Sequence, residues 1–354
     1  MDSLQDYDYQ QLSALVAELG VPKFRADQLY SLAMRHKSYD EGSNLPVALR
    51  EQLKGVVRDR AVEIVERLEG KDGVKKYLYL LADGNIIEGV YMPHRYGDTL
   101  CVSTQVGCRM GCAFCASGIG GLVRNLTAGE ILGQVLAANR DNGGTPEKRK
   151  VTNVVLMGSG EPLDNYDNVI RFLKLVGDPR GIGISPRNIS LSTSGLADRM
   201  IELADSGIPV VLTVSLHAAT DRKRSALMPV NRKYPIARVI EAARYYVRKT
   251  GRRVIFEYAL VRGENSDRKS AEELAALLKG LNCHVNLINL NPVKEKGLSG
   301  VSPEAIKSFI SVLESKGISA TLRRSMGGDV EGACGQLRRK YLRQKEEGGQ
   351  SDAG

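Results

Sequence analysis

Four of the six cysteines of the chain lie within the stretch TLCVSTQVGCRMGCAFCASG, residues 99–118. Three of them, Cys108, Cys112 and Cys115, have a C-x3-C-x2-C spacing, and the glycines between and beside them permit tight backbone turns. Three thiolates held this closely can bind three irons of a cubic 4Fe-4S cluster and leave the fourth iron with an open coordination position. An open position indicates a reactive metal centre.

Zinc is the alternative ligand for the same cysteines. A structural zinc site has four protein ligands, commonly in paired C-x2-C units, so Cys101 would have to supply the fourth thiolate. Unligated cysteines buried in the core are a further alternative. Of the two remaining cysteines, Cys283 alternates into the apolar stretch CHVNLINL, where we expect it to pack without chemistry, whereas Cys334 lies near the end of the chain.

Composition indicates a globular protein. The 354 residues are 42% hydrophobic and 26% charged, and no apolar run reaches the length of a membrane span. The start, MDSLQDYDYQ, lacks the basic and apolar regions of a secretory signal. We therefore expect a cytoplasmic location, where reducing conditions favour metal-binding or catalytic cysteines over structural disulfides.

Basic residues exceed acidic residues and occur in clusters. The formal net charge is +9, with clusters at residues 147–150 and 221–224 and Arg pairs starting at 252, 323 and 338. These clusters favour a polyanionic partner, although a solvated basic surface is an equally good interpretation. Aromatic residues make up only 5% of the chain and tryptophan is absent, which argues against extensive base-stacking platforms.

The elements that must position these residues can be predicted from periodicity. Helical patterns cover residues 10 to about 55, and short alternating segments follow, with Asp83-Gly84 as a hairpin turn. Six strand-helix units come next, which predicts an α/β fold with a parallel sheet, open or closed into a barrel, and reactive groups at the carboxyl ends of its strands. The expected parts are an N-terminal helical accessory domain, a small β connector, a barrel, a C-terminal segment with Cys334 and a disordered tail, at residues 1–60, 61–98, 99–325, 326–340 and 341–354.

A glycine-containing loop, MGSGEP, follows the apolar strand VTNVVL. Gly158 and Gly160 are spaced like the first two glycines of a dinucleotide-binding fingerprint. Leu163 occupies the place of the third glycine, so the loop does not fit that fingerprint.

Six ordered segments resemble the RlmN family of radical S-adenosylmethionine (SAM) adenosine methyltransferases: TLCVSTQVGCRMGCAFC, MGSGEPLDNYDNV, STSG, SLHAATDRKRSALMPVNRKYPI, NLINLNPV and GGDVEGACGQL. The resemblance covers nearly the whole chain, as far as Leu337. It implies a partial (β/α)6 radical SAM barrel, a 4Fe-4S cluster on Cys108, Cys112 and Cys115, and two SAM molecules per turnover. It further implies methylation of carbon 2 of an adenine in 23S ribosomal RNA (rRNA), in some members also in transfer RNA (tRNA), by a monomer that receives electrons from a flavodoxin or ferredoxin.

Further roles follow from the resemblance, because carbon 2 of adenine is electron-poor and does not attack the methyl group of SAM. Cys334 would accept a methyl group from one SAM, and a 5′-deoxyadenosyl radical from the second SAM would remove a hydrogen from it. The resulting methylene radical would add to the adenine, and Cys101 would release the adduct through a transient disulfide with Cys334. Glu88 matches the proton acceptor, a role that requires a desolvated carboxylate near the substrate; an exposed hairpin glutamate is the alternative.

The SAM-binding positions of the family also match this sequence. The step Gly160-Glu161 corresponds to contacts with the amino group of SAM, which a carboxylate and backbone carbonyls can bind. Small polar groups at strand ends can hydrogen-bond ribose hydroxyls and adenine edges, although a single serine in such a place is more often a turn residue. The matching strand-end positions are Ser192, Ser215, Leu216, His217 and Asn291.

Three other functions compete with this interpretation. The related Cfr family shares the cluster and both catalytic cysteines but methylates carbon 8 of the same adenosine. A non-catalytic iron-sulfur RNA-binding factor in ribosome assembly needs the cluster and the charge, but neither Cys334 nor Cys101. A radical SAM enzyme acting on a small molecule or a glycyl-radical protein has no use for the basic surface or for Cys334.

We predict that RNA binding weakens steeply with salt and depends on the 147–150 cluster. Replacing Lys148, Arg149 and Lys150 with Gln removes cationic contacts to phosphate, so affinity in a filter-binding titration should fall, as should its salt dependence. Methylation of Cys334 should persist, because the basic residues 147–150 are not part of the expected SAM site. An unchanged RNA affinity would contradict this prediction.

Overall fold

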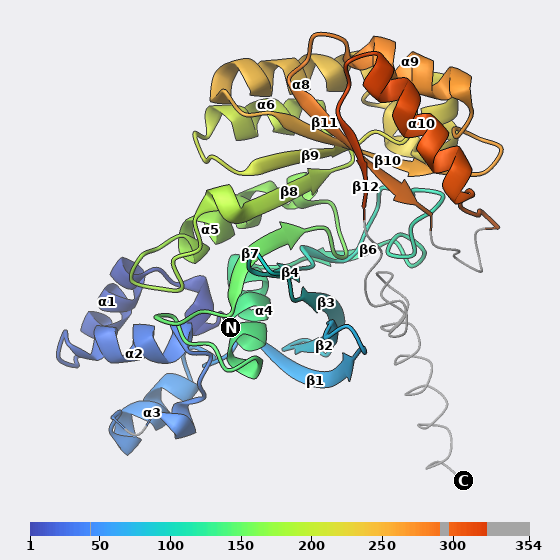
Figure 1. Ribbon diagram of the computed structural model, residues 1–354. Coiled ribbons are helices and arrows are strands. Elements are labelled where there is room, and N and C mark those ends of the chain that lie inside the picture. Colours follow the sequence, from blue (N-terminus) through green and yellow to red (C-terminus); the bar gives the residue numbers. More distant parts are fainter. Residues whose placement is uncertain (43, 291–296, 324–354) are drawn as a thin grey trace.

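The computed structural model describes residues 1–42, 44–290 and 297–323. The chain begins with short helices, as the periodicity predicts (Figure 1). The first long helix is capped by the Asp8 carboxylate, which accepts the backbone N–H of Gln11 (2.8 Å). The elements of this part are η1 (Leu4–Asp6), α1 (Tyr9–Glu18), α2 (Arg25–Met34), η2 (Tyr39–Glu41) and α3 (Val47–Lys54).

A ten-stranded sheet forms the centre of the molecule, in the order β1-β2-β3-β4-β7-β8-β9-β10-β11-β12. The strands β1 to β4 pair antiparallel, and β4 and all later strands of this sheet pair parallel. The predicted connector strands are therefore an extension of the barrel sheet itself. The strands are β1 (Val62–Glu69), β2 (Lys75–Leu81), β3 (Ile86–Met92), β4 (Asp98–Cys101), β7 (Val151–Leu156), β8 (Ile189–Thr193), β9 (Val211–Ser215), β10 (Val254–Leu260), β11 (Cys283–Asn289) and β12 (Ala320–Leu322).

Helices follow the parallel strands and cover the outer face of the curved sheet (Figure 1). The strands β4 and β7 to β11 are each followed by at least one helix, so the six predicted strand-helix units are present and the sheet is a partial α/β barrel. No helix in the described part of the chain is long and apolar enough to cross a membrane. The helices are α4 (Ala128–Asp141), η3 (Pro162–Asn165), α5 (Tyr166–Val176), η4 (Pro186–Asn188), α6 (Ala197–Asp205), α7 (Asp221–Leu227), η5 (Pro229–Arg232), α8 (Ile236–Thr250), α9 (Arg268–Leu278) and α10 (Pro303–Ser315).

The barrel strands have an apolar outer face and a polar inner face. In β8, Ile189 and Leu191 are fully buried, whereas Ser190 and Ser192 alternate with them and remain partly exposed. Since successive side chains of a strand point to opposite faces, this alternation places hydroxyls inside the barrel and aliphatic side chains against the helices. The barrel interior is therefore suited to bind a polar ligand.

The N-terminal segment docks on the barrel through the Asp6 carboxylate. One of its oxygens accepts the N–H of Gly129 (2.7 Å) in the first turn of α4, and the other accepts the Ser3 hydroxyl (2.8 Å). The positive end of the α4 dipole favours an anion there. A Cβ at Gly129 would lie 2.4 Å from the carboxyl carbon, so only glycine permits this approach. Arg171 of α5 donates to the Asp6 carbonyl.

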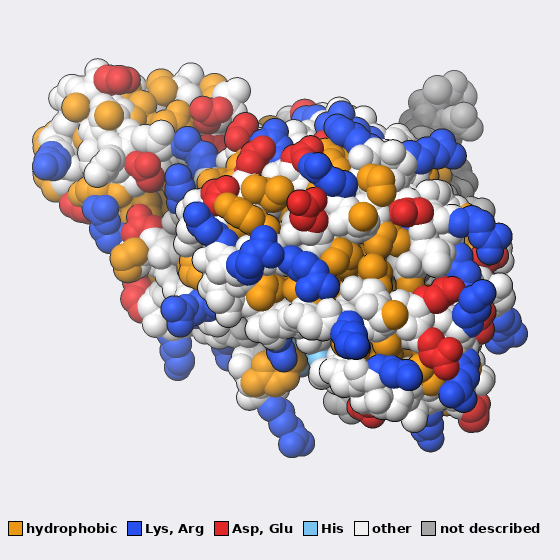
Figure 2. All heavy atoms as spheres, turned by 90° about the horizontal axis from the view of Figure 1, so that it is seen from above, with side chains coloured by type: hydrophobic (Ala, Val, Ile, Leu, Met, Phe, Trp, Pro, Cys, Tyr) orange, Lys and Arg blue, Asp and Glu red, His pale blue; other side chains and the backbone are white. Residues whose placement is uncertain are grey.

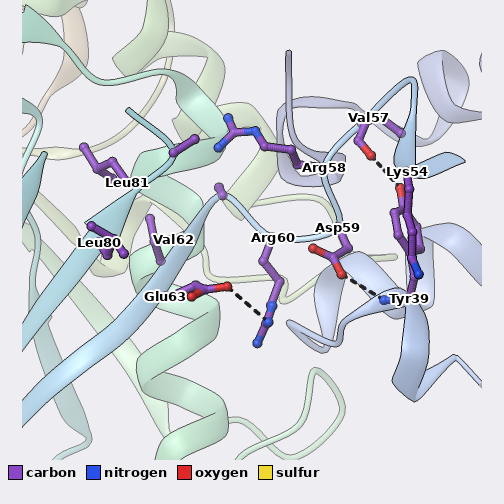
Figure 3. Close-up of a pocket in the computed structure, with 12 residues that line it drawn as sticks. Tyr39, Lys54, Val57, Arg58, Asp59, Arg60, Val62, Glu63, Leu80 and Leu81 are labelled. Atoms are coloured by element: carbon purple, nitrogen blue, oxygen red, sulfur yellow. Dashed lines mark hydrogen bonds and ion pairs between the residues drawn. The ribbon is translucent and has the colours of Figure 1, made fainter. Parts of the chain in front are cut away.

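A hollow of about 380 Å³ lies where the helical part meets β1 and β2 (Figure 3). Its polar groups bind one another: the Asp59 carboxylate accepts the N–H of Tyr39 (2.9 Å), and Arg60 forms an ion pair with Glu63 (3.3 Å). None of the candidate site residues lines this hollow.

We predict that Asp6→Ala lowers the free energy of unfolding by about 1–3 kcal/mol, because it leaves buried donors of Ser3 and Gly129 without an acceptor. Denaturant titration followed by circular dichroism measures the shift. Asp6→Asn keeps an acceptor but loses the charge at the helix end, so it should lose less. Equal stability of Asp6→Ala and the parent protein would contradict this account.

Candidate active site

The cysteine loop is closed on itself. It connects β5 (Gln105–Gly107) to β6 (Leu122–Asn125), which pair antiparallel, and the Cys108 N–H donates to the Gly121 carbonyl (2.9 Å). Gly107 has φ +80°, and a Cβ there would lie 2.0 Å from the same carbonyl oxygen. Only glycine fits at this close approach of the two strand ends, so Gly107 fixes where the cysteine loop leaves β5.

The three cysteine thiols lie in one partly buried environment. Burial, with a smaller contribution from the neighbouring Cys115, raises the pKa of Cys108 and of Cys112 to about 12. Like charges cannot be held there without a cation, and bound iron supplies that positive charge in exchange for the thiol protons. The donor set therefore fits an iron-sulfur cluster.

Zinc does not fit this arrangement. Within the residues that the structure describes, no three His, Cys, Asp or Glu side chains lie close enough together to hold one metal ion. A cube differs from a single ion, because each thiolate binds its own iron and the sulfurs lie further apart. Cys101, the fourth ligand that zinc would need, packs instead with Val74 and Val90.

The loop after β7 forms a cradle beside the cysteine loop. Gly160 has φ +112°, and a Cβ there would lie 2.7 Å from the Gln105 backbone nitrogen, so no other residue fits. The buried hydroxyl oxygens of Thr104 and Ser117 have no hydrogen-bond partner among the described residues. Gly160 is thus required by its close contact with Gln105 and Thr104, and buried hydroxyl groups without partners here and in the cysteine loop fit a polar ligand such as SAM.

Glu161 is almost fully buried at the start of η3. Burial raises the pKa of its carboxyl group, and the N–H groups of Ser194 (2.6 Å) and Leu163 (3.0 Å), which donate to the carboxylate, oppose that rise. The carboxylate thus joins the loop after β7 to the loop after β8. A buried carboxylate at this position can bind an ammonium group.

Glu257, which the sequence analysis did not select, joins the strand ends from inside the barrel. Burial raises the pKa of its carboxyl group, while the Arg323 guanidinium (3.1 Å) and hydrogen bonds from Ser192 and Ser215 lower it. Two predicted SAM contacts therefore meet at this carboxylate. The polar period-two alternation of Ser190, Ser192, Thr213 and Ser215 along neighbouring strands was the signal that could have located it.

Arg224 is fully buried, which corrects the assignment of the whole 221–224 cluster to a surface for polyanions. Its guanidinium donates to the carbonyls of Ser194 (2.6 Å), Ser215 (3.3 Å) and Leu216 (3.2 Å). Burial lowers its pKa to about 10, so the group remains cationic at neutral pH. Arg224 therefore organises strand ends and is not accessible to phosphate.

His217 links the strand ends to the cysteine loop. Its Nδ1 accepts the Ala259 N–H (2.9 Å), and its ring meets the Phe114 ring edge-on, with centroids 4.6 Å apart. Its backbone has φ +57°, which is uncommon for a residue other than glycine. Phe114 lies between two of the cysteines, so His217 positions the cysteine loop against the end of β9, where the adjoining Leu216 is buried.

Glu88 and Cys101 lie on neighbouring strands, β3 and β4. Glu88 is only 5% exposed and forms an ion pair with the fully buried Lys76 (Oε2 to Nζ 3.4 Å), so it is not an exposed hairpin residue. Cys101 is paired in register with Val90, two residues from Glu88, which puts both side chains on the same face of the sheet. Met157, the residue directly after β7, packs against the same cluster as Cys101.

The remaining predicted positions are not all covered. Asn291 and Cys334 lie outside the described residues. Cys283 begins β11 and packs against the main apolar core. The structure gathers Gly160, Glu161, Ser192, Ser215, Leu216 and His217 with the three loop cysteines at one rim of the barrel, through the contacts of Arg224, Glu161 and Phe114 described above.

Comparison with known proteins agrees with this geometry. The sequence model of the radical SAM superfamily matches residues 102–278. A probable dual-specificity RNA methyltransferase RlmN of Symbiobacterium thermophilum is 48% identical over 338 residues, covering 94% of this chain and 90% of that protein. A protein of the same description from Lachnospira eligens is 45% identical over 358 residues and covers both chains fully. The crystal structure of a radical SAM methyltransferase from Sphaerobacter thermophilus superposes with a TM-score of 0.91 and 44% identity, over 95% of this chain and 99% of that one.

We predict that protonation of His217 destabilises the fold below pH 6.5. Burial, with a smaller contribution from Arg224, lowers its pKa from 6.5 to about 3, so the unfolded chain binds more protons in this range. The free energy of unfolding should fall by roughly 2 kcal/mol for this group between pH 7.5 and pH 5. In His217→Asn, whose side chain tolerates positive φ and keeps an acceptor, that part of the pH dependence should vanish. Denaturant titrations at both pH values test this, and identical pH dependence of the two proteins would contradict it.

Proposed function

We propose, from the premise that this chain belongs to the RlmN family of dual-specificity RNA methyltransferases in the radical SAM superfamily, that it methylates carbon 2 of an adenine in 23S rRNA and in tRNA. The observation that carries the proposal is the convergence of the cysteine loop, the Gly160-Glu161 turn and the Leu216-His217 strand end on one rim of the barrel. When bound there, a 4Fe-4S cluster and SAM supply a methyl group and a hydrogen-abstracting radical.

The residues at the rim divide into two sets in this proposal. The first set, Cys108, Cys112 and Cys115, holds iron. The base of their loop is closed where Gly107 meets the Gly121 carbonyl, and the three thiols share one partly buried environment. The other set binds SAM: the Glu161 carboxylate and the Gly160 backbone take its amino group. Ser192, Ser215, Leu216 and His217 bind its nucleoside part, and Asn291 completes this set.

Glu88 is the proposed acceptor of the proton that leaves carbon 2. It is desolvated, as a carboxylate must be to act as a base toward a weakly acidic C–H group. The ion pair with Lys76 holds the carboxylate in place and balances its charge in the interior. After proton transfer, the Lys76 ammonium would face a neutral acid, which favours return of the proton to solvent.

Cys101 and Cys334 are the proposed carbon-handling thiols. Cys334 carries the methyl group and, after the adenine has been joined to it, Cys101 attacks that sulfur and releases the product as a disulfide forms. Cys101 is 6% exposed at the end of β4, in a position shielded from bulk solvent. A reduced cytoplasm and an electron donor such as flavodoxin or ferredoxin would keep both thiols and the cluster active.

The surface charge supports a polyanionic substrate, and by family resemblance the enzyme acts as a monomer. Figure 2 shows Lys and Arg side chains spread over one face, with acidic and apolar side chains between them. All four residues at 147–150 are exposed, although Glu147 forms an ion pair with Arg35 (2.5 Å). Positive charge distributed in this way provides affinity for the phosphate backbone of RNA, but it does not distinguish one base sequence from another.

We predict that Cys334→Ala abolishes RNA methylation, because no other thiol replaces the carrier. The assay uses anaerobically iron-loaded protein, an rRNA fragment and SAM labelled in its methyl group, followed by mass spectrometry of the digested RNA. Cys283→Ala is the matched control, since Cys283 packs in the core, and it should retain activity. Turnover by Cys334→Ala would refute the carrier role, and a methyl group on carbon 8 would assign the chain the Cfr reaction instead.

A further inference from the structure

A cavity of about 1110 Å³ is lined by inward side chains of the barrel sheet and by the loop before β4. At one end it reaches Met157 and Glu257, which adjoin the proposed SAM contacts Ser192 and Ser215. At the other it is bordered by the loop before β4, residues 93–96. The lining includes polar side chains from four strands of the sheet, Thr99, Ser190, Thr213 and Asn286, together with the apolar Val155 and Ile255. The cavity is at the upper limit of small-ligand pockets and large enough for a nucleoside.

The loop at the outer end presents an aromatic ring to solvent. Tyr96 is 81% exposed, more than any other large apolar side chain in the described part of the chain. Its ring is stacked on His94, with centroids 4.9 Å apart and ring planes within 7° of parallel. One face of the Tyr96 ring is thus covered by His94, and the exposed Arg95 stands between them in the sequence.

The base of this loop is fixed. The His94 N–H donates to the Asp98 carboxylate (3.3 Å), and the Tyr91 hydroxyl donates to the same group. Gly97 has φ +121°, and a Cβ there would lie 2.4 Å from the Thr152 hydroxyl oxygen, so glycine is required at the turn. An exposed ring on a fixed loop loses little conformational entropy when a partner stacks on it.

We propose that Tyr96, backed by His94, is a stacking platform for an unpaired nucleobase of the substrate RNA, next to the adenosine that enters the barrel cavity. Proteins recognise unpaired bases by stacking them on aromatic side chains, and the exposed Arg95 next to the ring supplies a cationic contact for a flanking phosphate. The lining also contains the carboxylates of Asp72 and Glu257, which do not bind phosphate, so the cationic contact is assigned to Arg95. This inference rests on the proposed function, because it assigns Tyr96 and His94 as contacts of the RNA that the enzyme would methylate.

The chain contains no tryptophan, so Tyr96→Trp creates a single fluorescent reporter at this position. Addition of the rRNA fragment should quench its emission, because a stacked base lies on the indole ring. Tyr245→Trp is the matched control: Tyr245 lies on α8, hydrogen-bonded to Asp205 outside the barrel, and its reporter should not respond. Both variants keep an aromatic side chain, so the comparison isolates the place of contact.

Affinity gives the second measurement. Tyr96→Ala should weaken binding of the fragment about 10-fold, whereas Tyr96→Phe and Tyr245→Ala should bind like the parent protein. If the parent protein binds and methylates the fragment but the emission of Tyr96→Trp is not quenched and Tyr96→Ala binds normally, the platform is refuted and the proposed function stands. If the parent protein, loaded with iron, neither binds nor methylates RNA, both proposals fail.

Discussion

One buried guanidinium holds the strand ends of the site together. Parallel strands that end at a common rim leave carbonyl groups without partners, and a buried carbonyl without a hydrogen bond is costly. Arg224 has five donors in a planar fork, and it satisfies carbonyls at the ends of β8 and β9 as well as the Asn231 side chain (2.9 Å). This one cation thus bridges the ends of β8 and β9, where Ser192, Ser215 and His217 lie.

The site also shows how a barrel stays stable with a polar centre. Its outer face is aliphatic and covered by helices, so the hydrophobic contribution to folding comes from outside the sheet. Inside, Glu257 and Glu161 are buried, but each is bound by hydrogen-bond donors or by Arg323. The interior is thus prepared for a charged ligand before that ligand arrives, which lowers the cost of ordering the site on binding.

Much of the fold could be predicted from sequence, since strand-helix alternation and the glycine-rich cysteine loop are local patterns. The loop cysteines were accessible for the same reason, whereas the strand-end serines were selected only through the resemblance to the RlmN family. Arg224 could not be placed, because DRKR has the composition of a solvated cluster and its burial is decided by carbonyls on distant strands. Glu257 and Tyr96 were missed because one acts by facing inward and the other by staying exposed, and neither property is visible in composition.

The strands before the barrel cannot be removed from this protein without exposing a sheet edge. Because β3 is hydrogen-bonded along β4, a shortened chain starting at the cysteine-bearing barrel would bare the flank of β4 as an open ladder, prone to join other chains edge to edge. It would also discard Glu88 and Lys76. The strands β1 to β3 are therefore part of the barrel sheet and carry the proposed proton acceptor, and chimeras between relatives should exchange them only together with the barrel.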